Sequence, residues 1–235
     1  MSILFNPPKA GPASALFFPM SQLVPESGIG QALADARLIA VLVIDEAESA
    51  VPLAEALLRG GVTAMELTLR TPAAFAAAAA IRAACPDMRL GLGTILSTDQ
   101  IAPALAAGAE FGVSPGVNPE IIRRAAEAGL PFGPGVMTPT DVDVAIREGC
   151  RLLKFFPAES AGGLAHLKNI AAPFAHLGPK FVPLGGIHLG NLKTWLDSDL
   201  VAAVGGSWIA PREAIQARDW QRIEADAREA MAVAK

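Results

Sequence analysis

The sequence predicts an α/β protein that folds as a single-domain (β/α)8 barrel. From residue 31 onwards, short β-branched apolar segments alternate with segments whose apolar residues have helical spacing. The eight expected strands begin about every 23 residues, between positions 38 and 201, which suits compact units with a helical crossover between parallel strands. Glycine stands between helix and strand at Gly108, Gly129 and Gly149, as is typical of such loops.

The strands are expected at residues 38–44, 62–68, 89–94, 110–114, 131–134, 151–155, 180–184 and 201–205. The helices are expected at residues 46–59, 71–84, 98–107, 118–128, 140–147, 163–174, 189–196 and 217–232. Eight units favour a closed barrel over an open doubly wound sheet. A dinucleotide-binding sheet would carry G-x-G-x-x-G after its first strand. The nearest match, at Gly91 and Gly93, lacks the third glycine and follows the third strand.

Residues 1–30 are predicted to be an irregular extension in front of a barrel domain of residues 31–235. The extension contains five prolines, which interrupt regular structure. Its apolar stretch at 13–20 resembles the core of a signal peptide, but Pro19 lies inside it and a single lysine precedes it. We therefore expect no export and a cytoplasmic location.

The composition argues against several classes of function. A net charge of −4 gives no general attraction to nucleic acid or to anionic membranes. No apolar run reaches the roughly 18 residues of a membrane span. Two distant cysteines, Cys85 and Cys150, and three scattered histidines predict neither a disulfide framework nor a metal site.

Polar residues interrupt the second expected strand. Glu66, Thr68 and Arg70 alternate with Leu67 and Leu69, so the three polar side chains share one face. Because helices cover the outer face of a barrel, we expect this polar face to point into the barrel mouth. The residues form either a Glu66–Arg70 ion pair with a structural role or part of a site.

A lysine stands inside the sixth expected strand. Lys154 is flanked by two leucines and two phenylalanines. An ammonium group in apolar surroundings loses hydration, which favours the neutral amine. A neutral amine can form a Schiff base with a ketone. The structural alternatives are a lysine that reaches solvent at the rim and one that pairs with Glu66.

Glycine pairs follow the last two expected strands. Gly185–Gly186 and Gly205–Gly206 let backbone amides approach an anion, and Ser207 adds a hydroxyl donor. Glycine pairs also end strands for local reasons. Barrels often hold a phosphate after their last two strands, so the presence of both glycine pairs there favours an anion site.

Six motifs then carry a resemblance to a known family. They are E-L-T-L-R (66–70), G-L-G-T (91–94), S-P-G (114–116), K-F-F-P-A (154–158), G-G-I (185–187) and G-G-S-W (205–208). In these motifs the chain resembles the class I 2-keto-3-deoxy-6-phosphogluconate (KDPG) and 4-hydroxy-2-oxoglutarate (KHG) aldolases, from about residue 31 to the C-terminus. The resemblance implies a (β/α)8 barrel that assembles as a homotrimer and uses no metal or organic cofactor.

The resemblance also implies a role for each matching residue. Lys154 would form the Schiff base with the C2 ketone of a 2-keto-3-deoxy acid. Glu66 would shuttle protons, through a water molecule, while the carbinolamine forms and the carbon–carbon bond breaks. Arg70 and Thr94 would bind the carboxylate of the pyruvyl half, for which the paired donors of arginine are suited.

The resemblance assigns the remaining pocket as well. Pro115 and Phe156 would wall the pyruvyl half. Four residues would hold the distal phosphate: Gly185, Gly186, Gly206 and Ser207. The family commonly has threonine before the first glycine pair, where this chain has Leu184. Because an isobutyl group replaces a hydroxyl, we expect weaker discrimination for a phosphorylated tail or a preference for the shorter KHG.

The expected reaction is the cleavage of KDPG to pyruvate and glyceraldehyde 3-phosphate, of KHG to pyruvate and glyoxylate, or of both. A first alternative is an aldolase for a related acid, such as the 6-phosphogalactonate. A second is a phosphosugar isomerase or epimerase, which would keep the glycine pairs but does not need Lys154. A third is a non-catalytic phosphosugar-binding barrel, which would predict loss of Lys154 or Glu66, and both are present.

Overall fold

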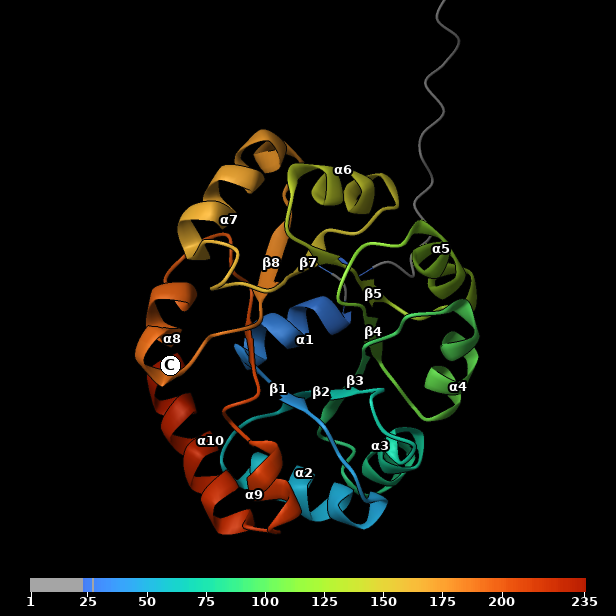
Figure 1. Cartoon of the computed structure of the whole chain (residues 1–235), viewed down its shortest axis with the longest axis vertical. Coiled ribbons are helices and arrows are strands. Elements are labelled where there is room, and N and C mark those ends of the chain that lie inside the picture. Colours follow the sequence, from blue (N-terminus) through green and yellow to red (C-terminus); the bar gives the residue numbers. More distant parts are fainter. Residues whose placement is uncertain (1–22, 27) are drawn as a thin grey trace, which may run out of the picture.

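The computed structural model describes residues 23–26 and 28–235 and shows an α/β protein with a curled parallel sheet. Figure 1 shows the helices α2 to α10 arranged around the strands. In this described part of the chain, no helix is long and apolar enough to cross a membrane.

The strands pair in parallel in two sheets, and each expected strand position holds a strand. Their bounds are β1 (Leu38–Leu42), β2 (Ala64–Thr68), β3 (Arg89–Gly93), β4 (Phe111–Val113), β5 (Phe132–Gly133), β6 (Gly135–Val136), β7 (Leu152–Phe155), β8 (Lys180–Pro183) and β9 (Val204–Gly206). One sheet has the order β5-β4-β3-β2-β1-β9 and the other has the order β6-β7-β8. The alternation predicted from the sequence is therefore confirmed.

The fifth expected strand is divided in two at Pro134. Proline has no backbone N–H and cannot donate to a neighbouring strand. Gly112 on β4 donates to the carbonyl of Pro131, whereas Lys154 on β7 donates its backbone N–H to the carbonyl of Pro134 at 3.0 Å. Pairing thus passes from β4 to β7 within a few residues.

The helices follow the expected alternation, with changes at their ends. Their bounds are α1 (Gly28–Ala36), α2 (Ala50–Arg59), α3 (Ala74–Ala84), α4 (Ile101–Ala106), α5 (Pro119–Ala128), α6 (Pro139–Arg147), α7 (Gly163–Ala171), α8 (Leu189–Leu196), α9 (Arg212–Gln216) and α10 (Trp220–Ala234). The last expected helix, 217–232, begins later than expected, at Trp220 of α10, and the short helix α9 before it was not expected. Arg218, with φ +55°, lies between the two helices. Asp219 then caps α10 by accepting from the backbone N–H of Arg222.

The expected boundary at residue 31 lies inside α1, which begins at Gly28. The carbonyl of Leu23 accepts the backbone N–H groups of Arg151 and Leu152, both at 3.1 Å. Leu23 and Leu33 are buried against inward-facing side chains of the strands. The packed structure therefore begins before residue 31, and residues 1–22 lie outside the described part.

An inner core fills the space between the strands. Phe111, Ile39 and Val182 meet Leu23 and Leu33 there. Gly91 on β3 makes room for Phe111, because a Cβ at this position would lie 2.2 Å from the ring.

Candidate active site

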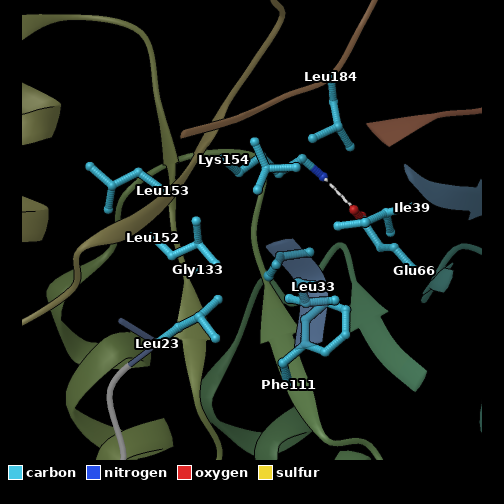
Figure 2. A pocket seen from close by; sticks show the side chains of 12 residues that line it. Leu23, Leu33, Ile39, Glu66, Phe111, Gly133, Leu152, Leu153, Lys154 and Leu184 are labelled. Carbon is cyan, nitrogen blue, oxygen red and sulfur yellow. Dashed lines mark hydrogen bonds and ion pairs between the residues drawn. The ribbon is translucent and has the colours of Figure 1, made fainter. Parts of the chain in front are cut away.

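Lys154 and Glu66 form a buried ion pair between β7 and β2. The Lys154 Nζ donates to Glu66 Oε1 at 2.8 Å and to Oε2 at 3.1 Å. The two residues are only 8% and 3% exposed, and Figure 2 shows their side chains pointing toward one another. The expected alternative of a Glu66–Arg70 pair is wrong, and the alternative of a Lys154–Glu66 pair is confirmed. The lysine is therefore buried beside a proton acceptor.

Gly93 creates the space that Glu66 occupies. In the register of β2 and β3, Glu66 lies opposite Gly91 and Thr68 opposite Gly93. A Cβ at Gly93 would lie 2.0 Å from Glu66 Oε1, so any other residue would displace the carboxylate. Sequence reasoning did not place Gly93 in the site. The available signal was its spacing of two residues from Gly91 on a strand next to β2.

A pocket above the ion pair collects most of the residues predicted for the site. Seven of them line it: Arg70, Lys154, Phe156, Leu184, Gly185, Gly206 and Ser207. The other lining residues are Val41, Val43, Thr68 and Gly205. Thr68 and Gly205 lie in segments that the sequence analysis singled out, whereas Val41 and Val43 were not proposed for the site. Alternation along the first strand could have identified these two valines, since they are two positions apart and share one face. Strands far apart in the sequence thus contribute to one pocket.

Thr94 does not line this pocket but lies beside Arg70, which does, and its backbone is strained. Its φ is +60°, which is rare for a β-branched residue and costs on the order of 1 kcal/mol or more. Arg70 donates its Nε–H to Thr94 Oγ1 at 3.3 Å. The two residues predicted to bind a carboxylate are therefore in contact, although they are 24 positions apart.

Pro115 and Gly186 do not line the pocket. Pro115 lines a separate groove with Leu96 and Ile121, and its carbonyl passes over Gly135, where a Cβ would lie 2.1 Å from that oxygen. Gly186 packs instead against the side chain of Glu159. The sequence placed both residues in the correct loops, but the structure puts them just outside the pocket wall.

A small apolar cavity lies on the other side of the ion pair. Figure 2 shows Leu23, Leu33 and Phe111 below Lys154 and Glu66, with Leu184 above them. Leu184 lines both this cavity and the upper pocket. The charged pair thus separates an apolar interior from a polar mouth.

The cysteines do not suit thiolate chemistry. Burial raises the pKa of Cys150 to about 12, and burial also raises the pKa of the Cys85 thiol. Among the residues that the structure describes, no group of three or more His, Cys, Asp and Glu could hold a metal ion.

Comparison with known proteins identifies the family. The family model for KDPG and KHG aldolases matches residues 29–226. The chain belongs to this family. It is therefore an aldolase, a carbon–carbon lyase, and the isomerase and non-catalytic alternatives are wrong.

Individual relatives and solved structures agree with the family assignment. A 2-dehydro-3-deoxy-phosphogluconate aldolase of Treponema pallidum is 44% identical over 84% of this chain and 93% of its own length. The KDPG aldolase of Legionella pneumophila, solved with pyruvate captured as a covalent carbinolamine intermediate, is 39% identical, with a TM-score of 0.81 over 86% of this chain and 97% of that one. The aldolase of Zymomonas mobilis ZM4, solved with 3-phosphoglycerate, is 36% identical, with a TM-score of 0.80 over 87% and 95%.

Proposed function

We propose that this family member is a class I aldolase that cleaves KDPG to pyruvate and glyceraldehyde 3-phosphate, KHG to pyruvate and glyoxylate, or both, through a Schiff base on Lys154. The observation that carries the proposal is the buried contact between Lys154 Nζ and the Glu66 carboxylate. An amine must lose a proton before it attacks a ketone. Glu66 is the acceptor within hydrogen-bond distance.

The reaction begins at Lys154. Its ammonium gives a proton to Glu66, and the free amine adds to the C2 ketone to form a carbinolamine. Glu66 then returns a proton to the C2 hydroxyl, directly or through a water molecule, and loss of water leaves the iminium. The short Lys154–Glu66 distances allow this exchange without movement of either strand.

Cleavage follows from the positive charge on the iminium. Removal of the proton from the C4 hydroxyl forms the aldehyde, and the electrons of the C3–C4 bond move to the iminium nitrogen. The product on Lys154 is the enamine of pyruvate, which takes a proton at C3. Hydrolysis of the resulting Schiff base releases pyruvate and restores the amine. Each proton transfer needs a nearby carrier, and we assign this role to Glu66 because its carboxylate lies 2.8 Å from Lys154 Nζ.

The two ends of the upper pocket suit the two ends of such a substrate. Arg70 and Thr94 offer donors for the carboxylate at C1, and Phe156 walls the pyruvyl half, its ring centroid 5.5 Å from Lys154 Nζ. Pro115 supports this half from the neighbouring groove. We assign the distal phosphate to the segments after β8 and at the end of β9, where Gly185, Gly206 and Ser207 line the pocket and Gly186 follows just outside it.

Leu184 makes the pocket wall between these two ends apolar. It is 5% exposed and packs on Gly205, where a Cβ would lie 2.5 Å from Leu184 Cγ. An isobutyl group gives no hydrogen bond to a hydroxylated tail. We therefore infer that the chain discriminates weakly for the phosphorylated tail or prefers KHG. A panel of substrates that includes the 6-phosphogalactonate analogue tests which aldehyde half the enzyme accepts.

We further infer that the two sheets form one closed (β/α)8 barrel and that the chain is a cytoplasmic homotrimer. Support for closure comes from the continuity of β5 and β6 around Pro134 and from the parallel bridge between Phe181 and Val201. Leu96, 61% exposed beside the Pro115 groove, offers apolar surface for assembly. Analytical ultracentrifugation measures the mass in solution, which should be that of three chains. The mass of a single chain would contradict the proposed homotrimer.

Borohydride trapping with pyruvate tests the central proposal. We expect one reduced pyruvate adduct per chain by intact mass, located on Lys154 by peptide mapping. The matched control is Lys154→Arg, which keeps a positive charge beside Glu66 but cannot form a Schiff base. Absence of an adduct on the wild-type chain in excess pyruvate would overturn the mechanism.

A further inference from the structure

We propose that Glu159 is a positioning residue for recognition of the substrate's distal phosphate, because it fixes the conformation of the Gly185–Gly186 loop. The inference rests on the proposed function, which places the phosphate at this loop. Glu159 lies five positions after Lys154, in the loop that follows β7. It touches neither the reacting carbons nor the ion pair.

The backbone of the Glu159 segment holds the loop by two hydrogen bonds. The N–H of Glu159 donates to the carbonyl of Gly185 at 3.0 Å, and the N–H of Ala158 donates to the carbonyl of Leu184 at 2.7 Å. The side chain adds a close contact, because a Cβ at Gly186 would lie 2.7 Å from Glu159 Cβ. The loop after β8 is thus tied to the loop that follows the catalytic strand.

The Glu159 carboxylate links the same loop to α8. Its Oε1 accepts the indole N–H of Trp195 at 2.8 Å and the amide of Asn191 at 3.0 Å. The Asn191 amide also donates to the carbonyl of Gly186 at 3.3 Å, and Trp195 is only 1% exposed. A single carboxylate oxygen therefore joins a buried indole to the glycine loop.

The two glycines need an external restraint. Gly185 has φ +99° and Gly186 has φ +78°, conformations that glycine adopts freely but does not maintain by itself. A loop that must be ordered by the ligand binds it more weakly than one that is already ordered. Glu159 restrains Gly185 through the backbone and Gly186 through the side chain and Asn191.

The charge of Glu159 supports a positioning role over direct contact. A carboxylate next to a phosphate repels it, so Glu159 does not serve as a phosphate ligand. As an acceptor for two donors it is well suited to hold the loop. Its contribution to binding is therefore transmitted through Gly185 and Gly186.

The test compares Glu159→Ala with Glu159→Gln in the full-length chain. For a phosphorylated substrate, we expect Glu159→Ala to raise KM about tenfold with little change in kcat, because the loss is in ordering the loop. For KHG, and for borohydride trapping with pyruvate, we expect no change. Glu159→Gln keeps a carbonyl oxygen that can accept from Trp195, so it should recover most of the wild-type KM.

Glu110→Ala is the matched structural control. Like Glu159, Glu110 accepts several hydrogen bonds, here from Arg82, Arg89 and the backbone N–H of Leu90. It lies immediately before β4 and does not line the pocket. We expect this variant to lose stability without a selective change in KM for the phosphorylated substrate.

The outcomes separate this inference from the proposed function. A wild-type chain that fails to trap pyruvate overturns the Schiff-base mechanism and the role of Glu159 with it. Two other outcomes overturn the positioning role alone, provided that the wild-type chain traps pyruvate normally. In the first, Glu159→Ala raises KM equally for the phosphorylated substrate and for KHG. In the second, it raises KM for neither. A Glu159→Gln variant as impaired as Glu159→Ala also overturns it, because the acceptor oxygen would then not be the group that matters.

Discussion

The two ends of the upper pocket are built from different parts of the fold. At the reacting end, Lys154 and Glu66 lie inside strands and are almost fully buried. At the distal end, Gly185 and Ser207 lie just after β8 or β9 and are partly or fully exposed. The reacting end uses side chains held by strand register, whereas the distal end uses backbone held by neighbouring loops.

This difference separates chemistry from recognition. A strand residue such as Glu66 cannot move without disturbing β1 and β3 on either side of it. A loop residue such as Leu184 can be exchanged without moving the ion pair. We therefore expect changes at the reacting end to abolish the reaction, and changes at the distal end to alter which substrate is used.

The largest effect is expected from Lys154→Arg. The guanidinium keeps the ion pair but cannot attack a ketone, so kcat should fall on the order of 10⁴- to 10⁶-fold, as when a nucleophile is removed. Steady-state kinetics measures the loss, and circular dichroism should show an unchanged fold. Residual activity near the wild-type level would show that Lys154 is not the nucleophile.

Glu66→Gln should have the next largest effect. The amide keeps the shape of the side chain but cannot carry the proton, so kcat should fall about 10²- to 10⁴-fold. Pyruvate trapping should slow in proportion, since carbinolamine formation needs the same proton transfers. If the variant trapped pyruvate at the wild-type rate, Glu66 would not be needed for carbinolamine formation.

Thr94 combines recognition at the reacting end with backbone strain. Thr94→Ala removes the hydroxyl beside Arg70 and should lower kcat/KM about 10- to 100-fold, the value of a hydrogen bond to a charged group. Thr94→Gly removes the hydroxyl and also the cost of φ +60°. We therefore expect equal loss of activity in both variants but a higher melting temperature for the glycine variant, measured by thermal unfolding.

At the distal end, Leu184→Thr should change preference without abolishing the reaction. A hydroxyl in place of the isobutyl group should raise the preference for KDPG over KHG by about tenfold. The ratio of kcat/KM for the two substrates measures this, with pyruvate trapping as the control for an intact reacting end. An unchanged ratio would contradict the assignment of Leu184 to the tail.

The smallest effect concerns a contact outside the pocket, between Asp45 and helix α9. Hydrogen bonds from Arg212 and then Gln216 lower the pKa of Asp45 from 3.8 to about 2, which ties the loop after β1 to α9. Because the pKa is lower in the folded state, the stabilisation is present above about pH 4 and is lost as the pH falls through about 2. Asp45→Asn should therefore melt below wild type at pH 7 and together with it at pH 2. A difference in melting temperature that is the same at pH 7 and pH 2 would contradict a stabilising contact between Asp45 and α9.

Much of the site was predictable because strand alternation is a local property. The positions of Glu66, Arg70 and Lys154 followed from charges within apolar segments, and the glycine pairs followed from their place after the last strands. The burial of Leu23, in front of the boundary predicted at residue 31, depends on distant strands and is not revealed by local patterning. The helix expected at 217–232 begins only at Trp220, and the short helix α9 before it was not predicted.

The sequence by itself determined the α/β alternation and which strands carry polar residues on one face, since side-chain periodicity follows from backbone geometry over a few residues. Only the tertiary structure decided that Glu66 pairs with Lys154, 88 positions away, that Gly93 makes room for this pair and that Glu159 holds the glycine loop. These contacts depend on the register between strands and on the packing of loops. Neither is encoded by the spacing of residues within one segment.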